Sequence, residues 1–228
     1  MQEITDLESK LGTTFINKDL LLSALTHRSY LNENPSWHTD HNERLEFLGD
    51  AVLELVVTEF LYNNYPNPEG ELTNWRAALV NSVMLAKVSG KFDLNAFLLL
   101  SRGEARDTGR ARQFILANAV EAVIGALYLD QGYKPCGQFI AKFILPELSE
   151  ILQAQSYRDG KSRFQEEAQE RVGITPEYKV LEEWGPDHAK QFRVGVFLGE
   201  EKVGEGTGAS KQEAQQSAAE EALRNRDW

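Results

Sequence analysis

The first two thirds of the chain repeat apolar residues at helical spacing. Up to about residue 152, leucines and other apolar residues recur three or four positions apart, which predicts a nearly all-helical region. Clusters of Asn, Pro and Gly, as at residues 63–70, interrupt this pattern and indicate turns. A polar stretch then follows at residues 153–160. We therefore expect a helical domain over residues 1–152 and a linker over residues 153–160.

After the linker the pattern changes to the two-residue period of strands. Ser162 and Gln165 have the spacing of a capping box, which predicts a helix that runs to about Val172. Residues 178–184 and 192–198 alternate, and residues 203–207 make a third short strand. A second capping box, Ser210 to Glu213, opens a last helix. The order α-β-β-β-α predicts an α+β domain over residues 161–228, so the fold class is multi-domain, α followed by α+β.

An acidic stripe marks the predicted helix that begins near residue 43. At 100° per residue Glu43, Glu46, Asp50 and Glu54 lie on one narrow side. Like charges one turn apart repel each other unless solvent or a cation screens them, and carboxylate oxygens are the ligands that Mg²⁺ prefers. The stripe is therefore a candidate metal site. The opposite side carries the apolar residues Leu45, Leu48, Val52, Leu55 and Val56.

The ordinary alternative is that the stripe is the solvated face of an amphipathic helix, as most acidic rows are. Phe47 argues against that interpretation, because it is an aromatic residue on the acidic side of the helix. An aromatic residue there is either stray exposure or part of an interface.

A second group of oxygen ligands lies in the apolar segment 113–130. Asn118 and Glu121 are three residues apart and share a helix face. A carboxylate on so apolar a helix is rarely buried without a partner, and an edge position or a pairing arginine is the usual explanation. If this face lies opposite the acidic stripe, the two groups form one cluster of oxygen ligands.

Composition narrows the possibilities. Cys136 is the only cysteine, which excludes an internal disulfide and a zinc site built on several thiolates. The N-terminus is polar and acidic, and no uninterrupted apolar run approaches 18 residues, so we expect a cytoplasmic protein with no membrane partner. The net charge of −11 argues against a general nucleic-acid binder, and the part from Asp159 onward is itself acidic, with 10 Lys and Arg against 15 Asp and Glu. The four histidines show no metalloprotease spacing, and we expect His27 to be structural.

Several motifs together carry a family resemblance. Residues 42–50, Asn-Glu-Arg-Leu-Glu-Phe-Leu-Gly-Asp, resemble the defining motif of the ribonuclease III family. Four further stretches agree in the family's order, at residues 25–30, 76–81, 103–110 and 115–122. The tail resembles a double-stranded-RNA-binding domain at residues 185–188, 204–206 and 210–214. The resemblance covers nearly the whole chain, and the nine-residue motif is highly specific.

The resemblance implies an all-α nuclease domain that forms a homodimer. In each protomer Glu46, Asp50, Asn118 and Glu121 would bind Mg²⁺, for which Mn²⁺ substitutes. Asp50 and Glu121 take the positions regarded as catalytic. Glu43 would lie at the dimer cleft near the RNA or the partner subunit, and Phe47 matches the family's interface aromatic. The two clusters would each cut one strand of an RNA duplex and leave 5′-phosphate and 3′-hydroxyl ends with short 3′ overhangs.

The resemblance also implies how the tail contacts duplex RNA. Gln165, Glu166 and Gln169 would meet one minor groove, and the loop with His188 would enter a second one. Lys211 would meet phosphates at the N-terminus of the last helix. The expected substrates are ribosomal RNA precursors and structured messenger RNAs.

Two positions depart from the family pattern. Asn118 stands where the family usually has Asp, so the cluster has one charge fewer. Gln212 replaces a second basic residue that is common in the family, which predicts weaker RNA binding. We expect an active enzyme, because Glu46, Asp50 and Glu121 are intact. The alternative is a duplex-RNA-binding protein with a weakened or inactive catalytic site.

Overall fold

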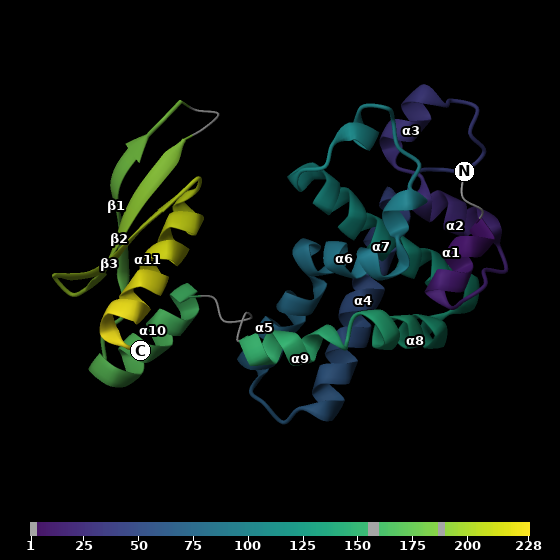
Figure 1. The fold of residues 1–228 in the computed structure, drawn as a ribbon. Helices are drawn as coiled ribbons and strands as arrows, with labels where there is room; N and C mark the ends of the chain where they lie inside the picture. Colours follow the sequence, from purple (N-terminus) through teal and green to yellow (C-terminus); the bar gives the residue numbers. More distant parts are fainter. Residues whose placement is uncertain (1–3, 155–159, 187–189) are drawn as a thin grey trace. The chain divides into compact units, whose positions relative to one another are not determined.

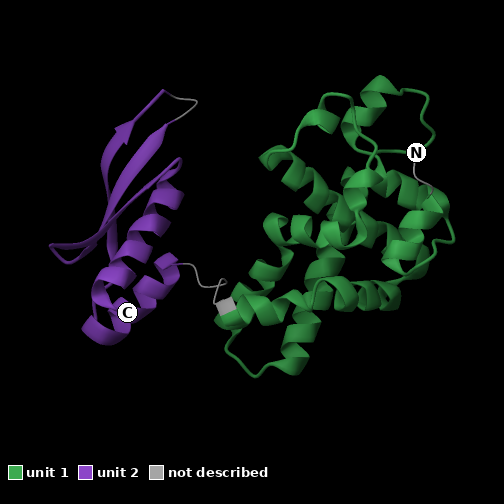
Figure 2. Ribbon diagram, in the orientation of Figure 1, with its two compact units in different colours: residues 1–157 green, residues 158–228 purple. Residues whose placement is uncertain are grey.

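The computed structural model describes residues 4–154, 160–186 and 190–228. The chain forms two compact units, residues 1–157 and residues 158–228 (Figure 2). Most of the predicted linker lies outside the described residues. Both ends of the predicted linker are helical instead. Gln153 and Ala154 belong to the last helix of the first unit, and Gly160 begins the first helix of the second.

The named elements of the first unit are all helices within its described residues, as the apolar periodicity predicts, and one isolated β-bridge joins Thr26 to Leu99 (Figure 1). Two helices of 22 residues, α4 and α7, are much longer than the others. The elements are α1 Ile4–Leu11, α2 Lys18–Leu25, α3 Arg28–Glu33, α4 Glu43–Asn64, α5 Glu69–Val80, α6 Ser82–Ser89, the short 3₁₀ helices η1 Gly90–Phe92, η2 Leu94–Ala96 and η3 Glu104–Arg106, then α7 Arg110–Gln131, α8 Tyr133–Phe143 and α9 Glu147–Ala154.

Helices α4 and α7 are in contact at two glycines, Gly49 and Gly125. A Cβ atom added to Gly49 would lie 1.8 Å from the carbonyl oxygen of Glu121, and one added to Gly125 would lie 2.1 Å from the carbonyl oxygen of Leu45. Neither position has room for a side chain, so the two backbones are in direct contact. This contact fixes which residues of α4 and α7 face each other.

The buried side of α4 is centred on Gly49, which corrects one expectation. Leu55 was expected on the apolar side but is 57% exposed. Leu48 is partly buried, whereas Leu53 and Val57, on the acidic flank of Gly49, are completely buried. The helix is therefore rotated so that its acidic stripe borders the core. The remaining residues that were expected to be buried are so: Leu45, Val52 and Val56.

The start of α4 is fixed by the buried residue Asn42. Its backbone N–H donates to the carbonyl of Thr26 at 2.9 Å, and its side-chain amide donates to the carbonyl of Ala24 at 3.4 Å. His27 follows Thr26 in the chain and caps α3, because its side chain accepts a hydrogen bond from the Ser29 N–H. Burial lowers the pKa of the His27 imidazole. The structural role expected for His27 is therefore what the structure shows.

Helix α7 is long and apolar enough, by composition alone, to cross a membrane. The expectation of no such helix was drawn from the length of uninterrupted apolar runs. Helix α7 has no run of the required length, because its few charged residues are spaced among apolar ones. Half of the apolar window is buried inside the unit, as is typical of a central core helix. Residues Val120, Val123, Ile124 and Leu127 are almost completely buried.

The second unit has the predicted order α-β-β-β-α. Helices α10 and α11 share one hydrophobic core with the sheet, whose strands are antiparallel in the order β1-β2-β3. Helix α10 begins before Ser162, so the capping box predicted there is wrong; Lys161 in its first turn instead donates to Gln215 of α11 at 2.9 Å. The elements are α10 Gly160–Val172, β1 Glu177–Trp184, β2 Gln191–Leu198, β3 Glu201–Gly208 and α11 Lys211–Arg226.

Helix α11 is held against β3 by small residues. A Cβ atom on Gly206 would lie 2.2 Å from the backbone nitrogen of Ala218, and one on Gly208 would lie 2.6 Å from that of Ala214. The helix begins as predicted, because the Ser210 hydroxyl accepts a hydrogen bond from the N–H of Glu213 at 3.2 Å. Strand and cap together determine where Lys211, the first residue of α11, is placed.

Replacing Gly49 or Gly125 with alanine should destabilise the first unit severely. The added methyl group meets a backbone carbonyl that cannot rotate away, so we expect a loss of about 3 kcal/mol or more in the free energy of unfolding, measured in urea. Gly137 of α8 is the control, because nothing lies within 4 Å of its Cβ position. Gly137→Ala should stabilise the protein by about 0.5–1 kcal/mol. Equal effects at Gly49 and Gly137 would refute the backbone contact.

Candidate active site

The glycine contact brings the two predicted groups of oxygen ligands together. Glu46 and Asp50 are on α4, on either side of Gly49 in the sequence, and Glu121 is on α7 one turn before Gly125. The charges of Asp50 and Glu46 act on Glu121, and the Asn118 amide is hydrogen-bonded to Glu46. The four side chains predicted to form one cluster therefore do converge from two helices.

The surroundings of this cluster disfavour the ionised form of its glutamates. Burial, followed by the charges of Asp50 and Glu46, raises the pKa of Glu121 to about 8. The pKa of Glu46 is also raised, first by burial and then by Glu43, while the Asn118 hydrogen bond opposes that shift. Carboxylates held this way favour a proton or a cation as their neighbour.

The donor set fits a hard divalent cation in its chemistry. All of its ligands are oxygens, from three carboxylates and one amide, and no sulfur or imidazole nitrogen belongs to it. As the side chains stand, however, no three His, Cys, Asp or Glu residues in the described part of the chain are gathered closely enough to hold one ion. The arrangement thus gives the ligand types and the excess negative charge, without a closed coordination shell.

Glu43 and Phe47 lie beside the cluster on the exposed side of α4. The Glu43 carboxylate lies 3.6 Å from the Arg28 guanidinium and 3.7 Å from Nδ1 of His41. Neither contact was predicted from the sequence. Phe47 is 83% exposed and contacts solvent rather than the core. Leu55 and Tyr62 follow it at helical spacing and are also exposed, so α4 carries an exposed apolar stripe.

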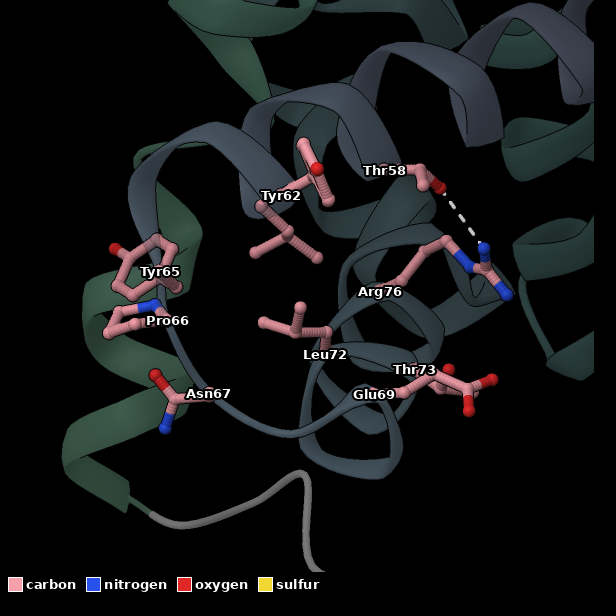
Figure 3. Close-up of a pocket in the computed structure, with 10 residues that line it drawn as sticks. Thr58, Tyr62, Tyr65, Pro66, Asn67, Glu69, Leu72, Thr73 and Arg76 are labelled. Carbon is pink, nitrogen blue, oxygen red and sulfur yellow. Dashed lines mark hydrogen bonds between the residues drawn. The ribbon is translucent and has the colours of Figure 1, made fainter.

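A pocket in the first unit lies away from this cluster. It has a volume of about 720 Å³ and lies between the C-terminal half of α4 and α5, where Tyr62 and Leu72 line it (Figure 3). Arg76 donates to the hydroxyl of Thr58 at 3.0 Å at its edge. None of the site residues predicted from the sequence lines this pocket, so we do not assign the chemistry to it.

The predicted RNA-binding residues of α10 share one surface hollow in the second unit. Gln165, Glu166 and Gln169 line it together with Ser162 and Glu170, and its volume is about 540 Å³. The structure thus places the three predicted residues side by side. His188 lies outside the described residues.

Lys211 begins α11, as predicted, but it has a partner that the sequence did not indicate. Its ammonium lies 3.3 Å from a carboxylate oxygen of Glu183 and 5.6 Å from the centre of the Phe192 ring. The helix contact at Gly49 and Gly125 was not predicted from the sequence, although each glycine lies within one turn of a candidate ligand on the same helix. That spacing is the sequence signal that indicates the two glycines.

Comparisons with known proteins agree with this architecture. Residues 17–148 match the family described as Ribonuclease-III-like, and residues 161–226 match the double-stranded RNA binding motif. Ribonuclease 3 of Pelotomaculum thermopropionicum is 43% identical over 226 residues, which cover 99% of this chain and 94% of that protein. Ribonuclease 3 of Natranaerobius thermophilus is 47% identical over 219 residues, which cover 96% of this chain and 94% of that one.

A solved structure resembles the first unit in particular. The nuclease domain of ribonuclease III from Campylobacter jejuni is 40% identical, with a TM-score of 0.58, and the match covers 64% of this chain and 97% of that one. The helical unit with its converging carboxylates, the α-β-β-β-α unit and these relatives lead to one conclusion: the chain belongs to the ribonuclease III family, as a nuclease unit followed by a double-stranded-RNA-binding unit.

Proposed function

We propose that this ribonuclease III endonuclease, which acts on double-stranded RNA, depends on Mg²⁺ held by Glu46, Asp50, Asn118 and Glu121, with Mn²⁺ as a substitute. The observation that carries the proposal is the convergence of three carboxylates from α4 and α7, where burial, followed by the charges of Asp50 and Glu46, raises the pKa of Glu121 to about 8. Such mutual repulsion is costly unless a cation offsets it. Oxygen ligands and a charge deficit together favour a hard divalent ion.

Asp50 and Glu121 are the proposed catalytic residues. A bound Mg²⁺ supplies a Lewis acid and an activated water at the phosphodiester. Because three carboxylates repel an RNA phosphate, the cluster accepts its substrate only when that charge is neutralised. Asn118 holds the Glu46 carboxylate through its amide, so it orients one ligand as well as offering an oxygen of its own. Glu43 stands at the edge of the cluster, where we place the RNA or the partner subunit.

The exposed stripe on α4 supports a homodimer. Phe47, Leu55 and Tyr62 present apolar surface that a monomer would leave in water. A solved Campylobacter jejuni nuclease domain is described as having a region involved in dimer formation, and it is 40% identical to this chain. With two clusters in the dimer, each would cut one strand and leave 5′-phosphate and 3′-hydroxyl ends with short 3′ overhangs.

The second unit is proposed to hold the duplex. Gln165, Glu166 and Gln169 form one surface of α10 that fits the shape-based recognition of an RNA minor groove, and Lys211 would contact phosphates. His188 keeps its expected role in a second minor groove. We further propose that the enzyme acts in the cytoplasm, on ribosomal RNA precursors and structured messenger RNAs.

Asn118 decides between this proposal and a duplex-RNA-binding protein with a weakened catalytic site. We expect the wild type to cut a long RNA duplex in Mg²⁺, with Asn118→Asp cutting at a roughly three- to tenfold lower Mg²⁺ concentration because it adds a charged ligand. A metal titration on gels measures both. If the wild type shifts the duplex without cutting it at any Mg²⁺ or Mn²⁺ concentration, while the Asp variant cuts, the alternative is correct.

The metal-free protein should gain stability when Glu121 becomes glutamine. A carboxyl group whose pKa is raised on folding costs no stability below its unfolded value of 4.5 and costs progressively more up to about pH 8. In EDTA, the stability of the Glu121→Gln variant should therefore match that of the wild type at pH 4.5 and exceed it at pH 8. We expect about 1–2 kcal/mol, because water screens this half-buried group.

Mg²⁺ at pH 8 should narrow that difference in stability by stabilising the wild type more than the variant. Thermal denaturation followed by circular dichroism measures both effects. A Glu121→Gln variant that is less stable than the wild type at pH 8 in EDTA would contradict the proposed repulsion.

Phe47→Ala should weaken the dimer. Removing the aromatic ring takes away the most exposed apolar group of α4, and analytical ultracentrifugation should show a monomer–dimer equilibrium shifted by about tenfold or more toward monomer. Ile16→Ala is the control, because Ile16 is 82% exposed but lies outside α4. If both variants sediment like the wild type, the α4 stripe is not the dimer contact.

A further inference from the structure

Glu183 holds two lysines at the end of the sheet in the second unit. One of its carboxylate oxygens lies 3.3 Å from the ammonium of Lys211, and the other lies 2.9 Å from the ammonium of Lys190. Lys211 begins α11, Lys190 directly precedes β2, and Glu183 is near the end of β1. One side chain therefore joins three segments through their charges.

The strand register explains this arrangement. Glu183 is the cross-strand partner of Phe192, so the two side chains lie on the same face of the sheet. Val194 and Val196, at the same parity in β2, are buried in the core beneath α11, so this is the face that α11 covers. Both lysine ammoniums also lie over the Phe192 ring, at 5.6 Å and 5.7 Å from its centre.

Both oxygens of the carboxylate accept from a lysine. The pKa of Glu183 is held below its usual range, chiefly by the hydrogen bonds from Lys190 and Lys211. An RNA phosphate would offer the same lysines the same kind of ligand, a pair of anionic oxygens. The two anions, one internal and one from the substrate, compete for one pair of cations.

We propose that Glu183 is an internal counter-ion that competes with RNA phosphate for Lys211 and Lys190, and so sets the affinity of the second unit for duplex RNA. The inference rests on the phosphate-binding role proposed above for Lys211. A lysine already neutralised by a carboxylate neutralises less phosphate charge, so fewer of the cations condensed on the RNA are released and the salt-dependent part of binding is smaller. Glu183 is in this sense a positioning residue, because it acts on the RNA through the lysines.

The scarcity of other cations near Lys211 gives this competition a large effect on RNA binding. The next residue is Gln212, so α11 begins with one cation rather than two. The part of the chain from Asp159 onward has 15 acidic residues against 10 basic ones. With so few cations available, occupying two of them removes a large share of the attraction for phosphates.

The test is equilibrium binding of the full-length protein to a short RNA duplex in Ca²⁺ or EDTA, over a range of salt concentrations. Glu183→Gln should bind roughly two- to fivefold more tightly at low salt. Its plot of log affinity against log salt should be steeper by up to about 1, as expected when one more phosphate contact releases counter-ions. A change in slope is a readout that a purely structural role for Glu183 would not produce.

Glu182→Gln is the matched control. Glu182 is the neighbouring residue on the same strand, pairs with Arg193 at 3.1 Å, and points to the opposite face of the sheet. The substitution removes the same charge without freeing Lys211. It should leave the affinity and the salt slope close to those of the wild type.

Lys211→Gln separates the inference from the proposed function. Lys211→Gln should weaken binding by itself, and most of the gain from Glu183→Gln should disappear in the double variant. If Lys211→Gln binds as well as the wild type, the phosphate role of Lys211 fails and the inference fails with it. If Lys211→Gln weakens binding while Glu183→Gln leaves it unchanged, weakens it, or acts no more strongly than Glu182→Gln, only the inference is overturned.

Discussion

The candidate active site depends on one contact, the approach of the α4 and α7 backbones at Gly49 and Gly125. No side chain fits between the helices there, so each helix is fixed in rotation and in register against the other. Glu46 and Asp50 lie within one turn of the first glycine, and Glu121 lies one turn from the second. The backbone contact and the proposed catalytic cluster are therefore two consequences of the same crossing.

This placement is unfavourable for the fold by itself. Burial and mutual repulsion raise the pKa values of Glu46 and Glu121, so the metal-free cluster lowers stability at neutral pH. The surrounding core tolerates that cost because α4 and α7 bury long apolar faces around it. Electrostatic repulsion of this kind, held by a well-packed scaffold, is what the proposed cation site requires.

The second unit uses the same small-residue packing for a different purpose. Gly206 and Gly208 let β3 lie directly against α11, and this fixes the N-terminus of α11 and Lys211 near the end of β1. In so acidic a chain, the position of each lysine relative to its nearest carboxylate affects how strongly a polyanion is bound. Under the proposed role of Lys211, recognition of RNA and neutralisation within the protein involve the same few cations.

The amino-acid sequence predicts the order of elements, the two kinds of domain and the residue types of the acidic cluster, because periodicity, capping residues and the nine-residue motif are local signals. Three-dimensional packing, by contrast, places Gly49 toward the core and Leu55 toward solvent, and begins α10 ahead of Ser162. The same holds for the pairing of Lys211 with Glu183, 28 positions earlier in the chain. These features arise from contacts between residues far apart in sequence, whose relative positions depend on how helices and strands rotate and pack against each other, and no local pattern records that rotation.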